Sequence, residues 1–371
     1  MNAPIARLFI GILVLFTLLV AFTSNWAVFD AENLQAKSEN KRPLFEAQRI
    51  ERGKILTVDG ETIADSKKKG KGDSLRYVRK YPLGDLFGNP VGYSFISQGQ
   101  VGLERTEQDV LTGQSNEFVS LLDQVRGQAQ AGSDIVTTLN AAAQRVAAEQ
   151  LAGRPGAVVA IEPSTGAVRV MQSTPGYDPN SIPTDISKFN QDPTAPLVDR
   201  PVQSIYPPGS TMKVVTAAAA LDSGKVAADE PIDAISGMNF SGVPLANDYG
   251  QDFPGETMQD ALTNSVNTYF AQVGERVGAD TLLEYMRRFG FERDPQVELP
   301  DDEKGASGVY NSKGQLVDSG FDIARVAIGQ GGEEGQVLAS PMQMAEVAAT
   351  IANGGTLMKP TLIQQIKDPD G

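Results

Sequence analysis

The sequence contains no cysteine and no histidine. The absence of cysteine excludes disulfides, thiol nucleophiles and thiolate-bound zinc, and the absence of histidine excludes a Ser-His-Asp triad and any imidazole metal ligand. A hydroxyl nucleophile in this chain must therefore take its base from lysine, tyrosine, aspartate or glutamate. No metal-ligand spacing and no phosphate-binding loop is found in the sequence, so we expect neither a metal nor an organic cofactor.

Basic residues are outnumbered by acidic ones. The chain has 371 residues, of which 32 are Lys or Arg and 46 are Asp or Glu, so the formal net charge is −14. The resulting field repels nucleic acids unless a local basic patch overcomes it. One basic stretch is present, KKKGKGDSLRYVRK at Lys67–Lys80, and we interpret it as a solvated basic loop or hairpin. We therefore expect no nucleic-acid partner.

A long apolar run lies near the N-terminus. The stretch RLFIGILVLFTLLVAFTSNWAVF at Arg7–Phe29 has no charge after Arg7 and supplies about the 20 residues that a membrane span needs. Asp30 and Glu32 follow the run, so the positive-inside rule predicts a cytoplasmic N-terminus and an extracytoplasmic body. A cleaved signal peptide is the alternative, but its small-x-small cleavage site is weak here. We predict an uncleaved single-pass anchor in the cell membrane at residues 1–29.

The rest of the chain is long enough for two domains. Strand-like runs on either side of Asp59-Gly60 predict a hairpin, and TTLNAAAQRVAAEQLAG predicts a helix with Asn140 as its N-cap and Gly153 as its stop. We place a domain boundary near Gly153. A small membrane-proximal mixed α/β domain is then expected at 30–152, and a second domain at 153–371.

The second domain combines strands and helices. The apolar runs that flank PSTG in Gly156–Thr174 predict a hairpin. The segment Pro175–Pro208 is rich in Pro, Asp, Asn and Ser, so we expect an irregular surface excursion there. Helical signals dominate from Ser210 onward, and Ser340 is expected to cap a helix that stops at Asn353-Gly354. The fold class predicted for the body is α+β.

A serine and a lysine stand three residues apart in IYPPGSTMKVVTAAAALDSG. Pro208-Gly209 cannot continue a helix, so the helix is expected to begin with Ser210 as its N-cap and to carry Lys213 on the same face. VVTAAAAL, which follows, has no polar face and predicts a helix buried on all sides. Burial and the positive helix terminus favour the neutral amine of Lys213, which a general base for Ser210 requires. A capping serine followed by an interface lysine is the structural alternative.

A second polar pair occurs in GETMQDALTNSVNTYFAQVGERVG. Thr257 and Asp260 resemble a capping box that opens one helix, and Ser265 and Asn267 lie at the junction with the next. A hydroxyl and a carboxamide two residues apart on a bend can pass on a proton while holding a substrate amide. Helix capping by Ser265 and Asn267 is the structural alternative.

S-x-x-K at Ser210–Lys213, followed by S-x-N at Ser265–Asn267, resembles the ordered signature of penicillin-recognising serine acyltransferases. Further segments resemble class B penicillin-binding proteins, most of all their actinobacterial penicillin-binding protein A type. They are the R-G-x-I-like RGKILTVDGETIA at Arg52–Ala64, the G-x-E-like GLERTEQDVLTG at Gly102–Gly113, the hairpin segment at Gly156–Asn180, and the G-Q-G segment with its following helix at Ala327–Gly355. The resemblance covers nearly the whole chain after the anchor.

This resemblance implies a membrane-anchored D,D-transpeptidase that cross-links peptidoglycan, with a transpeptidase domain made of an antiparallel sheet and a helical subdomain. By the family's roles, Ser210 attacks the penultimate D-alanine of a stem peptide and Lys213 takes its proton. Ser265 relays a proton to the leaving amine, and Asn267 binds the substrate backbone. β-Lactams are expected to acylate Ser210 as mimics of D-Ala-D-Ala. The family also suggests a lipid-II-polymerising glycosyltransferase as a partner.

The third motif of the family, K-T/S-G, has no counterpart after Asn267. EKGASG at Glu303–Gly308 does not fit it, and the chain ends at QQIKDPDG, where the family continues to the strand that carries the motif. We therefore expect a transpeptidase domain truncated before this motif, as a fragment of a longer protein rather than a degenerate homologue. GGEEG at Gly331–Gly335 is longer than the family's usual link, and we assign it no function.

Two other functions compete with the transpeptidase. A serine D,D-carboxypeptidase or β-lactamase uses the same Ser-Lys chemistry but transfers the acyl group to water, and it needs no long membrane-proximal region. A membrane-anchored scaffold or β-lactam sensor would keep the site only for binding. The lifetime of a penicillin adduct separates the first alternative from a transpeptidase, and replacement of Ser210 separates the second.

Overall fold

The computed structural model describes residues 3–26, 48–71, 75–114, 131–332 and 334–369. The predicted end of the anchor at Phe29, together with Asp30 and Glu32, lies outside these described residues. The first helix, α1 at Ala3–Ser24, includes a window at Arg7–Ser24 that is long and apolar enough to cross a membrane. None of this window is buried in the protein, so α1 is the candidate membrane anchor.

The body that follows mixes helices and strands, which confirms the predicted α+β class. Its helices and 3₁₀ turns are η3 Gly84–Leu86, α4 Gly88–Val91, α5 Leu103–Thr106, α6 Gln108–Thr112, α8 Ala141–Leu151, η4 Pro179–Ser181, α9 Ile182–Gln191, α10 Arg200–Gln203, η5 Gly209–Met212, α11 Lys213–Asp222, η6 Asp248–Gly250, α12 Met258–Thr263, α13 Asn267–Val277, α14 Ala279–Arg288, η7 Asp301–Glu303, α15 Ile323–Val326 and α16 Pro341–Ala352. Its strands are β1 Ile55–Leu56, β2 Thr62–Lys69, β3 Arg76–Lys80, β4 Ser94–Phe95, β5 Gly99–Gln100, β6 Asp134–Thr137, β7 Gly156–Ile161, β8 Val168–Thr174, β9 Ile232–Ala234, β10 Met238–Phe240, β11 Val243–Leu245, β12 Phe253–Glu256, β13 Gly308–Tyr310, β14 Gly331–Gly332, β15 Gly335–Leu338 and β16 Ile363–Lys367.

The largest sheet joins strands that are far apart in the chain. Its order is β16-β6-β1-β2-β3, in which β1 runs parallel to β6 and the other neighbours are antiparallel. The β1–β2 connection is the predicted turn, where Gly60 takes φ of +88° that a side chain would disfavour. The sheet therefore combines strands from both sides of Gly153.

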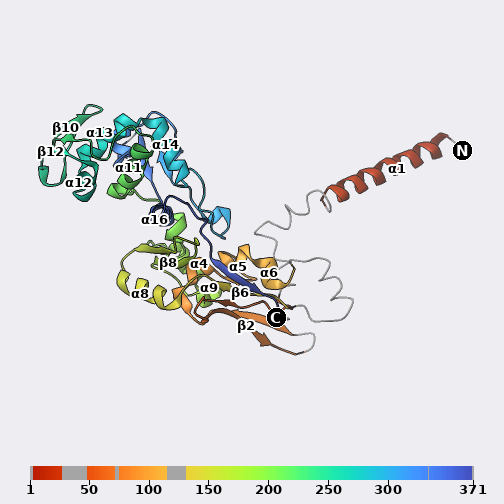
Figure 1. Ribbon diagram of the computed structural model, residues 1–371. Coiled ribbons are helices and arrows are strands. Elements are labelled where there is room, and N and C mark those ends of the chain that lie inside the picture. The colour runs from red at the N-terminus through yellow and green to blue at the C-terminus, as the bar shows by residue number, and fades with distance from the viewer. Residues whose placement is uncertain (1–2, 27–47, 72–74, 115–130, 333, 370–371) are drawn as a thin grey trace.

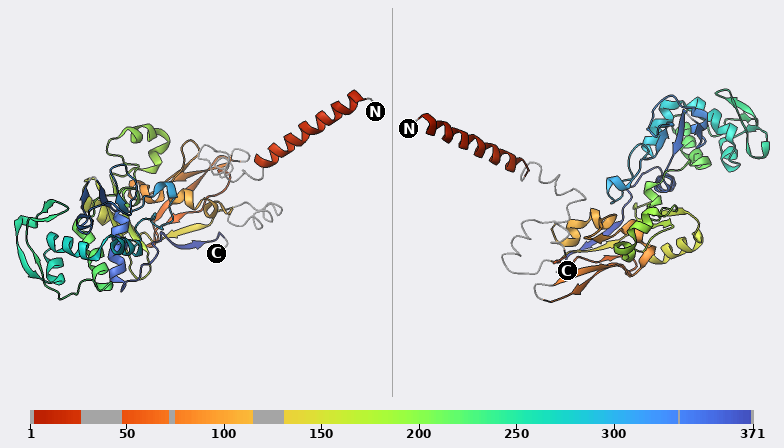
Figure 2. Two further views of the ribbon diagram at one scale, coloured as in Figure 1. Left: turned by 90° about the horizontal axis from the view of Figure 1, so that it is seen from above. Right: turned by 180° about the vertical axis from the view of Figure 1, so that it is seen from behind.

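Two hydrophobic cores build the body, and they correspond to the two lobes in Figure 1. One core lies between α11, α13 and α14 and includes the fully buried Phe270 and Tyr269. The other lies around β1, β6 and β8 and includes Ile55, Ile135 and Met171. α16 contributes Val347 to the first core and Met342 to the second, so this helix links the two lobes. The two lobes are also distinct in the right-hand view of Figure 2.

A buried ionic cluster accounts for two of the segments that carry the family resemblance. The Glu104 carboxylate accepts hydrogen bonds at 2.6 Å from Nε of both Arg52 and Arg79, and the Tyr81 hydroxyl donates to it at 3.1 Å. Burial alone would raise the pKa of Glu104, but the two guanidinium groups hold it below its usual value. Arg52 precedes β1 and Glu104 lies in α5, so this cluster ties the start of the sheet to the helices that cover it.

Local capping signals predicted several helix boundaries correctly. Asn140 caps α8 by accepting a hydrogen bond from the Ala143 amide at 2.8 Å, and Thr257 and Ser340 cap α12 and α16 in the same way. One expectation was wrong: the segment Pro175–Pro208 is not irregular throughout, because it contains α9 and α10. α9 begins with Ile182-Pro183, where proline is compatible with the first turn of a helix.

Candidate active site

Ser210 lies in the 3₁₀ turn η5 that leads directly into α11. The sequence suggested that it would be an N-cap, but its backbone is helical and its side chain makes no capping bond, so this expectation was wrong. Gly209 makes the turn possible by adopting φ of +56°. Ser210 is exposed, whereas Met212 and Lys213 after it are completely buried. The hydroxyl of Ser210 is thus directed to the surface at the start of a buried helix and is not used to hold that helix.

Lys213 is the centre of the polar cluster. Its Nζ donates hydrogen bonds to Ser210 Oγ at 3.1 Å, to Ser265 Oγ at 3.0 Å, to the Ser265 carbonyl at 2.6 Å and to Asn267 Oδ1 at 2.7 Å. An ammonium has three N–H groups, so it cannot serve all four acceptors at once. The structure brings together all four residues that the sequence singled out, although they lie on η5, on α11, in the turn after α12 and on α13.

Burial changes the protonation of Lys213. Its side chain is 0% exposed, and desolvation lowers its pKa from 10.5 to about 8, although the Asp248 carboxylate raises it. The ring of Phe270 lies 5.9 Å from Nζ and forms part of the apolar wall. The neutral amine that a general base requires is therefore available near neutral pH.

Ser265 is held in a strained conformation at the end of α12. Its φ is +55°, a region that glycine usually occupies. The Val266 amide donates to the Ala261 carbonyl and the Ser265 amide to the Leu262 carbonyl, which are the bonds of a Schellman motif. This motif turns both the carbonyl and the hydroxyl of Ser265 toward Lys213. Backbone strain of this kind is concentrated at functional sites.

Asn267 begins α13 and is supported by a loop that no sequence motif marks. Its Nδ2 donates to the Ala246 carbonyl at 3.1 Å, which leaves one N–H of that amide for another acceptor. The buried Asn247 accepts from the amide and the hydroxyl of Thr268 and donates to the Ala234 and Gln251 carbonyls. Asn247 thereby fixes the start of α13 and places Asp248 where its charge reaches Lys213. In the sequence, Asn247 looks like an ordinary turn residue, and no periodic pattern distinguishes it.

Backbone contacts from the G-Q-G segment fix the turn that precedes Ser210. The Gly209 amide donates to the Gly329 carbonyl at 3.0 Å, and Tyr206 and Ala339 exchange two backbone hydrogen bonds. A Cβ on Gly329 would lie 1.9 Å from the Gly209 carbonyl oxygen. Only glycine can therefore occupy position 329 without moving the turn. This contact gives Gly329 a structural role that the sequence pattern alone could not supply.

Among the described residues, no group of three or more Asp and Glu side chains is arranged to hold a metal ion. The polar cluster instead has the components of nucleophilic catalysis: a hydroxyl, an amine with a lowered pKa beside it, and a second hydroxyl in contact with the same amine. Lys213 can accept a proton from one hydroxyl and transfer it to the other. This arrangement suits acyl transfer through a covalent serine intermediate.

Two family signatures match the chain. The penicillin binding protein transpeptidase domain matches residues 156–370, and the penicillin binding protein A dimerisation domain matches residues 52–135. The two matches fall on either side of the boundary proposed near Gly153, although the exact division of the chain remains a prediction.

Relatives that match most or all of the chain include peptidoglycan transpeptidases. The chain is 33% identical to peptidoglycan D,D-transpeptidase PbpA of Mycolicibacterium smegmatis, over 100% of this chain and 76% of that protein. It is 31% identical to peptidoglycan D,D-transpeptidase MrdA of Escherichia coli, over 71% of this chain and 44% of that protein. Among solved structures, penicillin-binding protein A from M. tuberculosis in its imipenem acyl-enzyme complex matches with a TM-score of 0.75 and 30% identity, covering 88% of this chain and 76% of that one.

Proposed function

The chain belongs to the family of penicillin-binding protein transpeptidases, and from this premise we propose that it is a peptidoglycan D,D-transpeptidase whose acyl-enzyme forms on Ser210. The assignment of catalytic roles to these residues rests on one observation. A single completely buried amine, Lys213 Nζ, lies within 3.1 Å of Ser210 Oγ and 3.0 Å of Ser265 Oγ. The predicted resemblance to class B penicillin-binding proteins is confirmed by the matching family signatures and relatives.

The first half of the reaction is acylation. Lys213 in its neutral form accepts the proton of Ser210 as Oγ attacks the carbonyl carbon of the penultimate D-alanine in a stem peptide. The backbone N–H of Ser210 contributes one donor to the developing oxyanion. The bond to the terminal D-alanine breaks, and Ser265 relays the proton from Lys213 to the departing amine. The products are the acyl-serine and free D-alanine.

The second half transfers the acyl group. The amine of a neighbouring stem peptide attacks the acyl-serine carbonyl and loses a proton through Ser265 and Lys213, and Ser210 leaves with its proton restored. Asn267 contributes the N–H that its bond to Ala246 leaves available, and this group binds the substrate backbone. β-Lactams enter the same first step, since ring opening on Ser210 gives an acyl-enzyme without a leaving amine that diffuses away.

Membership of the family also supports a proposal for the topology, the domains and a partner of the protein. α1 is proposed to anchor the protein with its N-terminus in the cytoplasm, because Arg7 precedes the apolar run and acidic residues follow it. The body then faces peptidoglycan, with residues 30–152 as a membrane-proximal domain and 153–371 as the transpeptidase domain. A lipid-II-polymerising glycosyltransferase is the proposed partner, because a cross-linking enzyme needs newly polymerised strands as its substrate.

The test of this function is the fate of a penicillin adduct. The full chain in detergent micelles is incubated with a fluorescent penicillin, and the labelled peptide is identified by mass spectrometry. We expect one adduct, on Ser210, that decays slowly and is released faster by an added D-amino acid acceptor. A folded protein that forms no adduct contradicts acyl transfer by this chain. Rapid release to water without an acceptor effect would identify a serine hydrolase of the carboxypeptidase or β-lactamase type.

The rate of acylation is expected to depend on pH through Lys213. Since burial lowers its pKa to about 8, about a tenth of the amine is neutral at pH 7 and about nine-tenths at pH 9. Acylation should therefore rise with pH and level off above 8. The Asp248 carboxylate raises this pKa, so Asp248→Asn should move the profile to lower pH. Stopped-flow acylation of both proteins measures the shift, and coincident profiles would contradict the role of Asp248.

Gly329→Ala is expected to disturb the turn before Ser210. The new Cβ would meet the Gly209 carbonyl, and Gly329 also has φ of +77°, so both overlap and strain oppose it. Overpacking of this kind costs about 1–3 kcal/mol or more, and acylation should fall by at least about tenfold as the turn moves. Gly332→Ala is the matched control, because a Cβ there meets nothing within 4 Å. Thermal unfolding and acylation rates are measured together, and equal behaviour of the two variants would contradict the role of Gly329.

A further inference from the structure

The basic stretch that the proposed function leaves unused forms the hairpin β2–β3. In its register Asp65 pairs with Lys80, Lys67 with Val78, and Lys69 with Arg76. Directly paired residues and alternate residues of one strand share a face of the sheet. Lys67, Lys69, Arg76 and Lys80 therefore lie on one face, and all four are exposed. The opposite face carries Ser66 and Arg79, which are buried against the body.

The charges on this face are mostly not neutralised within the chain. Asp65 forms an ion pair with Lys67. Lys69, Arg76 and Lys80 form no ion pair with any residue that the structure describes. Lys69 and Arg76 stand directly opposite each other, and like charges at such positions destabilise a strand pair. In a chain with a net charge of −14, the hairpin therefore carries a local excess of positive charge that the described residues do not neutralise.

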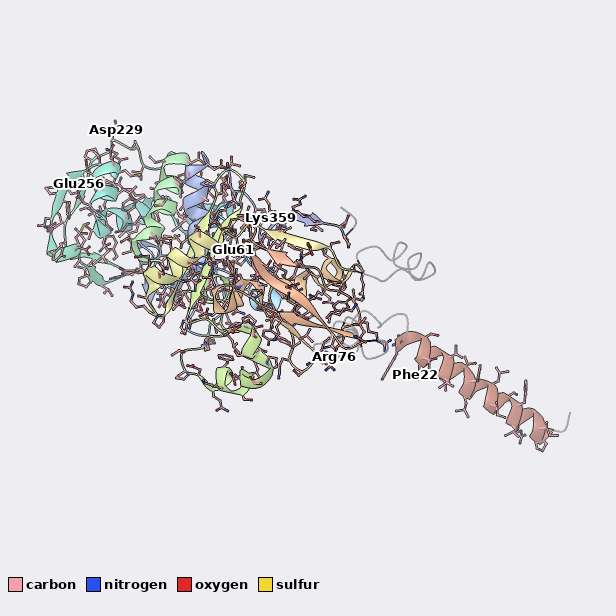
Figure 3. All side chains as sticks on the ribbon, turned by 90° about the horizontal axis from the view of Figure 1, so that it is seen from below. Phe22, Glu61, Arg76, Asp229, Glu256 and Lys359 are labelled. Atoms are coloured by element: carbon pink, nitrogen blue, oxygen red, sulfur yellow. The ribbon has the colours of Figure 1, made fainter. Side chains whose placement is uncertain are left out.

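The hairpin lies where the chain enters the body from α1. The Tyr77 amide of β3 donates to the Gln48 carbonyl at 2.8 Å, and Gln48 belongs to the first segment described after the helix. Figure 3 shows Arg76 at one end of the body and Asp229 and Glu256 at the other. The active-site helices α11 and α13 belong to the lobe that carries Asp229 and Glu256 (Figure 1). With α1 as the proposed anchor, the basic face lies at the end of the body where the chain enters from the membrane helix, and it is remote from Ser210.

We propose that the exposed face of β2–β3 binds the anionic phospholipid headgroups of the membrane in which α1 is anchored. The inference rests on the proposed anchor and not on the proposed reaction. Clusters of Lys and Arg next to a membrane helix bind anionic lipid surfaces through the summed attraction of their charges. Docking of this face fixes the orientation of the body, with the hairpin against the membrane. The other lobe, which carries Ser210, is then directed toward the cell wall.

The composition of the face favours a lipid surface over a protein partner. Three of the four cations on this face are lysines, and lysine is depleted in protein interfaces. The apolar side chain on the face is that of Val78. A stable protein interface needs a desolvated apolar or aromatic centre, which these side chains do not provide. Lysine ammonium groups bind phosphate as mobile point charges and need no fixed geometry. These properties match a fluid array of phosphate headgroups.

The test uses the full chain in vesicles, and the lack of cysteine allows labelling at one introduced site. A fluorophore on Lys68→Cys reports on the hairpin, and one on Asp229→Cys reports on the far end. The vesicles are phosphatidylcholine with or without phosphatidylglycerol, and a nitroxide on the headgroups quenches nearby fluorophores. We expect quenching at residue 68 only when phosphatidylglycerol is present, its loss as ionic strength rises from about 0.05 to 0.5 M, and no quenching at residue 229.

Charge reversal identifies the residues responsible. Each cation near an anionic surface contributes about 1 kcal/mol, roughly a fivefold change. The triple variant Lys69→Glu, Arg76→Glu and Lys80→Glu should therefore shift the docking equilibrium by at least about 100-fold and abolish the quenching. The control reverses Lys188, Lys313 and Lys359, which are exposed and lie outside the hairpin, and it should keep the quenching.

Two further measurements separate a failure of lipid binding from a failure of the proposed reaction or of the proposed anchor. Penicillin acylation of the triple variant should be unchanged, which shows that it is folded and tests the reaction independently. Co-flotation with pure phosphatidylcholine vesicles tests the anchor, since the hairpin contributes nothing there. Equal quenching with and without phosphatidylglycerol, or undiminished quenching in the triple variant, overturns the proposal. An unquenched hairpin in phosphatidylglycerol vesicles overturns it as well and assigns the face to a protein partner or to solvent.

Discussion

Replacement of Ser210 by alanine is expected to abolish the penicillin adduct and the transpeptidase reaction. Removal of a serine nucleophile from a comparable catalytic group costs on the order of 10⁶ in rate, because no neighbouring group can form the acyl intermediate. The folded structure should be unaffected, since Ser210 is exposed and, among the residues that the structure describes, its hydroxyl accepts a bond only from Lys213. A change in unfolding free energy within about 0.5 kcal/mol is expected. The measurements are adduct formation by mass spectrometry and thermal unfolding of the same sample.

The adjacent threonine supplies the control. Thr211 is also exposed and carries a hydroxyl, but that hydroxyl donates to the Pro208 carbonyl at 2.7 Å and does not contact Lys213. Thr211→Ala should therefore retain acylation within a small factor. In cells that depend on this protein, Ser210→Ala should fail to support growth, whereas Thr211→Ala should support it. Normal growth with Ser210→Ala would favour the scaffold or β-lactam sensor instead of the enzyme.

The features that the sequence predicted well are those decided by near neighbours. Asn140 and Ser340 cap helices because a short polar side chain meets an amide three residues later, and this needs no tertiary information. The pairing of Ser210 with Lys213 is similar, since residues three apart share a helix face. Prediction failed within the same motif where tertiary contacts intervene. Gly329 and Ala339 fix the preceding turn, so Ser210 enters a 3₁₀ turn and leaves the N-cap role unused.

The features that could not be predicted depend on contacts between distant segments. β16 pairs with β6 although more than 200 residues separate them, and the pattern of neither strand specifies its partner. Asn247 supports α13 through four hydrogen bonds whose partners lie up to 21 residues away. The candidate site was predicted because the motif resemblance joined Ser210 to Ser265. Physical reasoning from spacing gave each pair a role, but only the fold brings Lys213 into contact with both.

Lys213→Met is expected to lower the rate of acylation by about 10²–10⁴, the usual contribution of a general base. Methionine has a similar length and no charge, so it should occupy the completely buried position without the desolvation cost of an amine. The residual rate should lose the rise with pH that the wild-type protein shows, because the titrating group is gone. Acylation rates across the pH range, measured beside thermal unfolding, test both parts of this prediction.

A second substitution at the same position separates proton transfer from charge. Lys213→Arg keeps a cation that can donate to Ser265 and Asn267, but a guanidinium does not become neutral in this pH range. It should be as inactive as Lys213→Met if Lys213 acts as the base of Ser210, and substantially active if the site needs only a positive charge. Lys225→Met is the control for loss of a hydrogen-bonded lysine, since Lys225 donates to the Val277 carbonyl and to Thr281 away from the site. Equal losses in Lys225→Met and Lys213→Met would show that the effect comes from the fold and would reject Lys213 as the base.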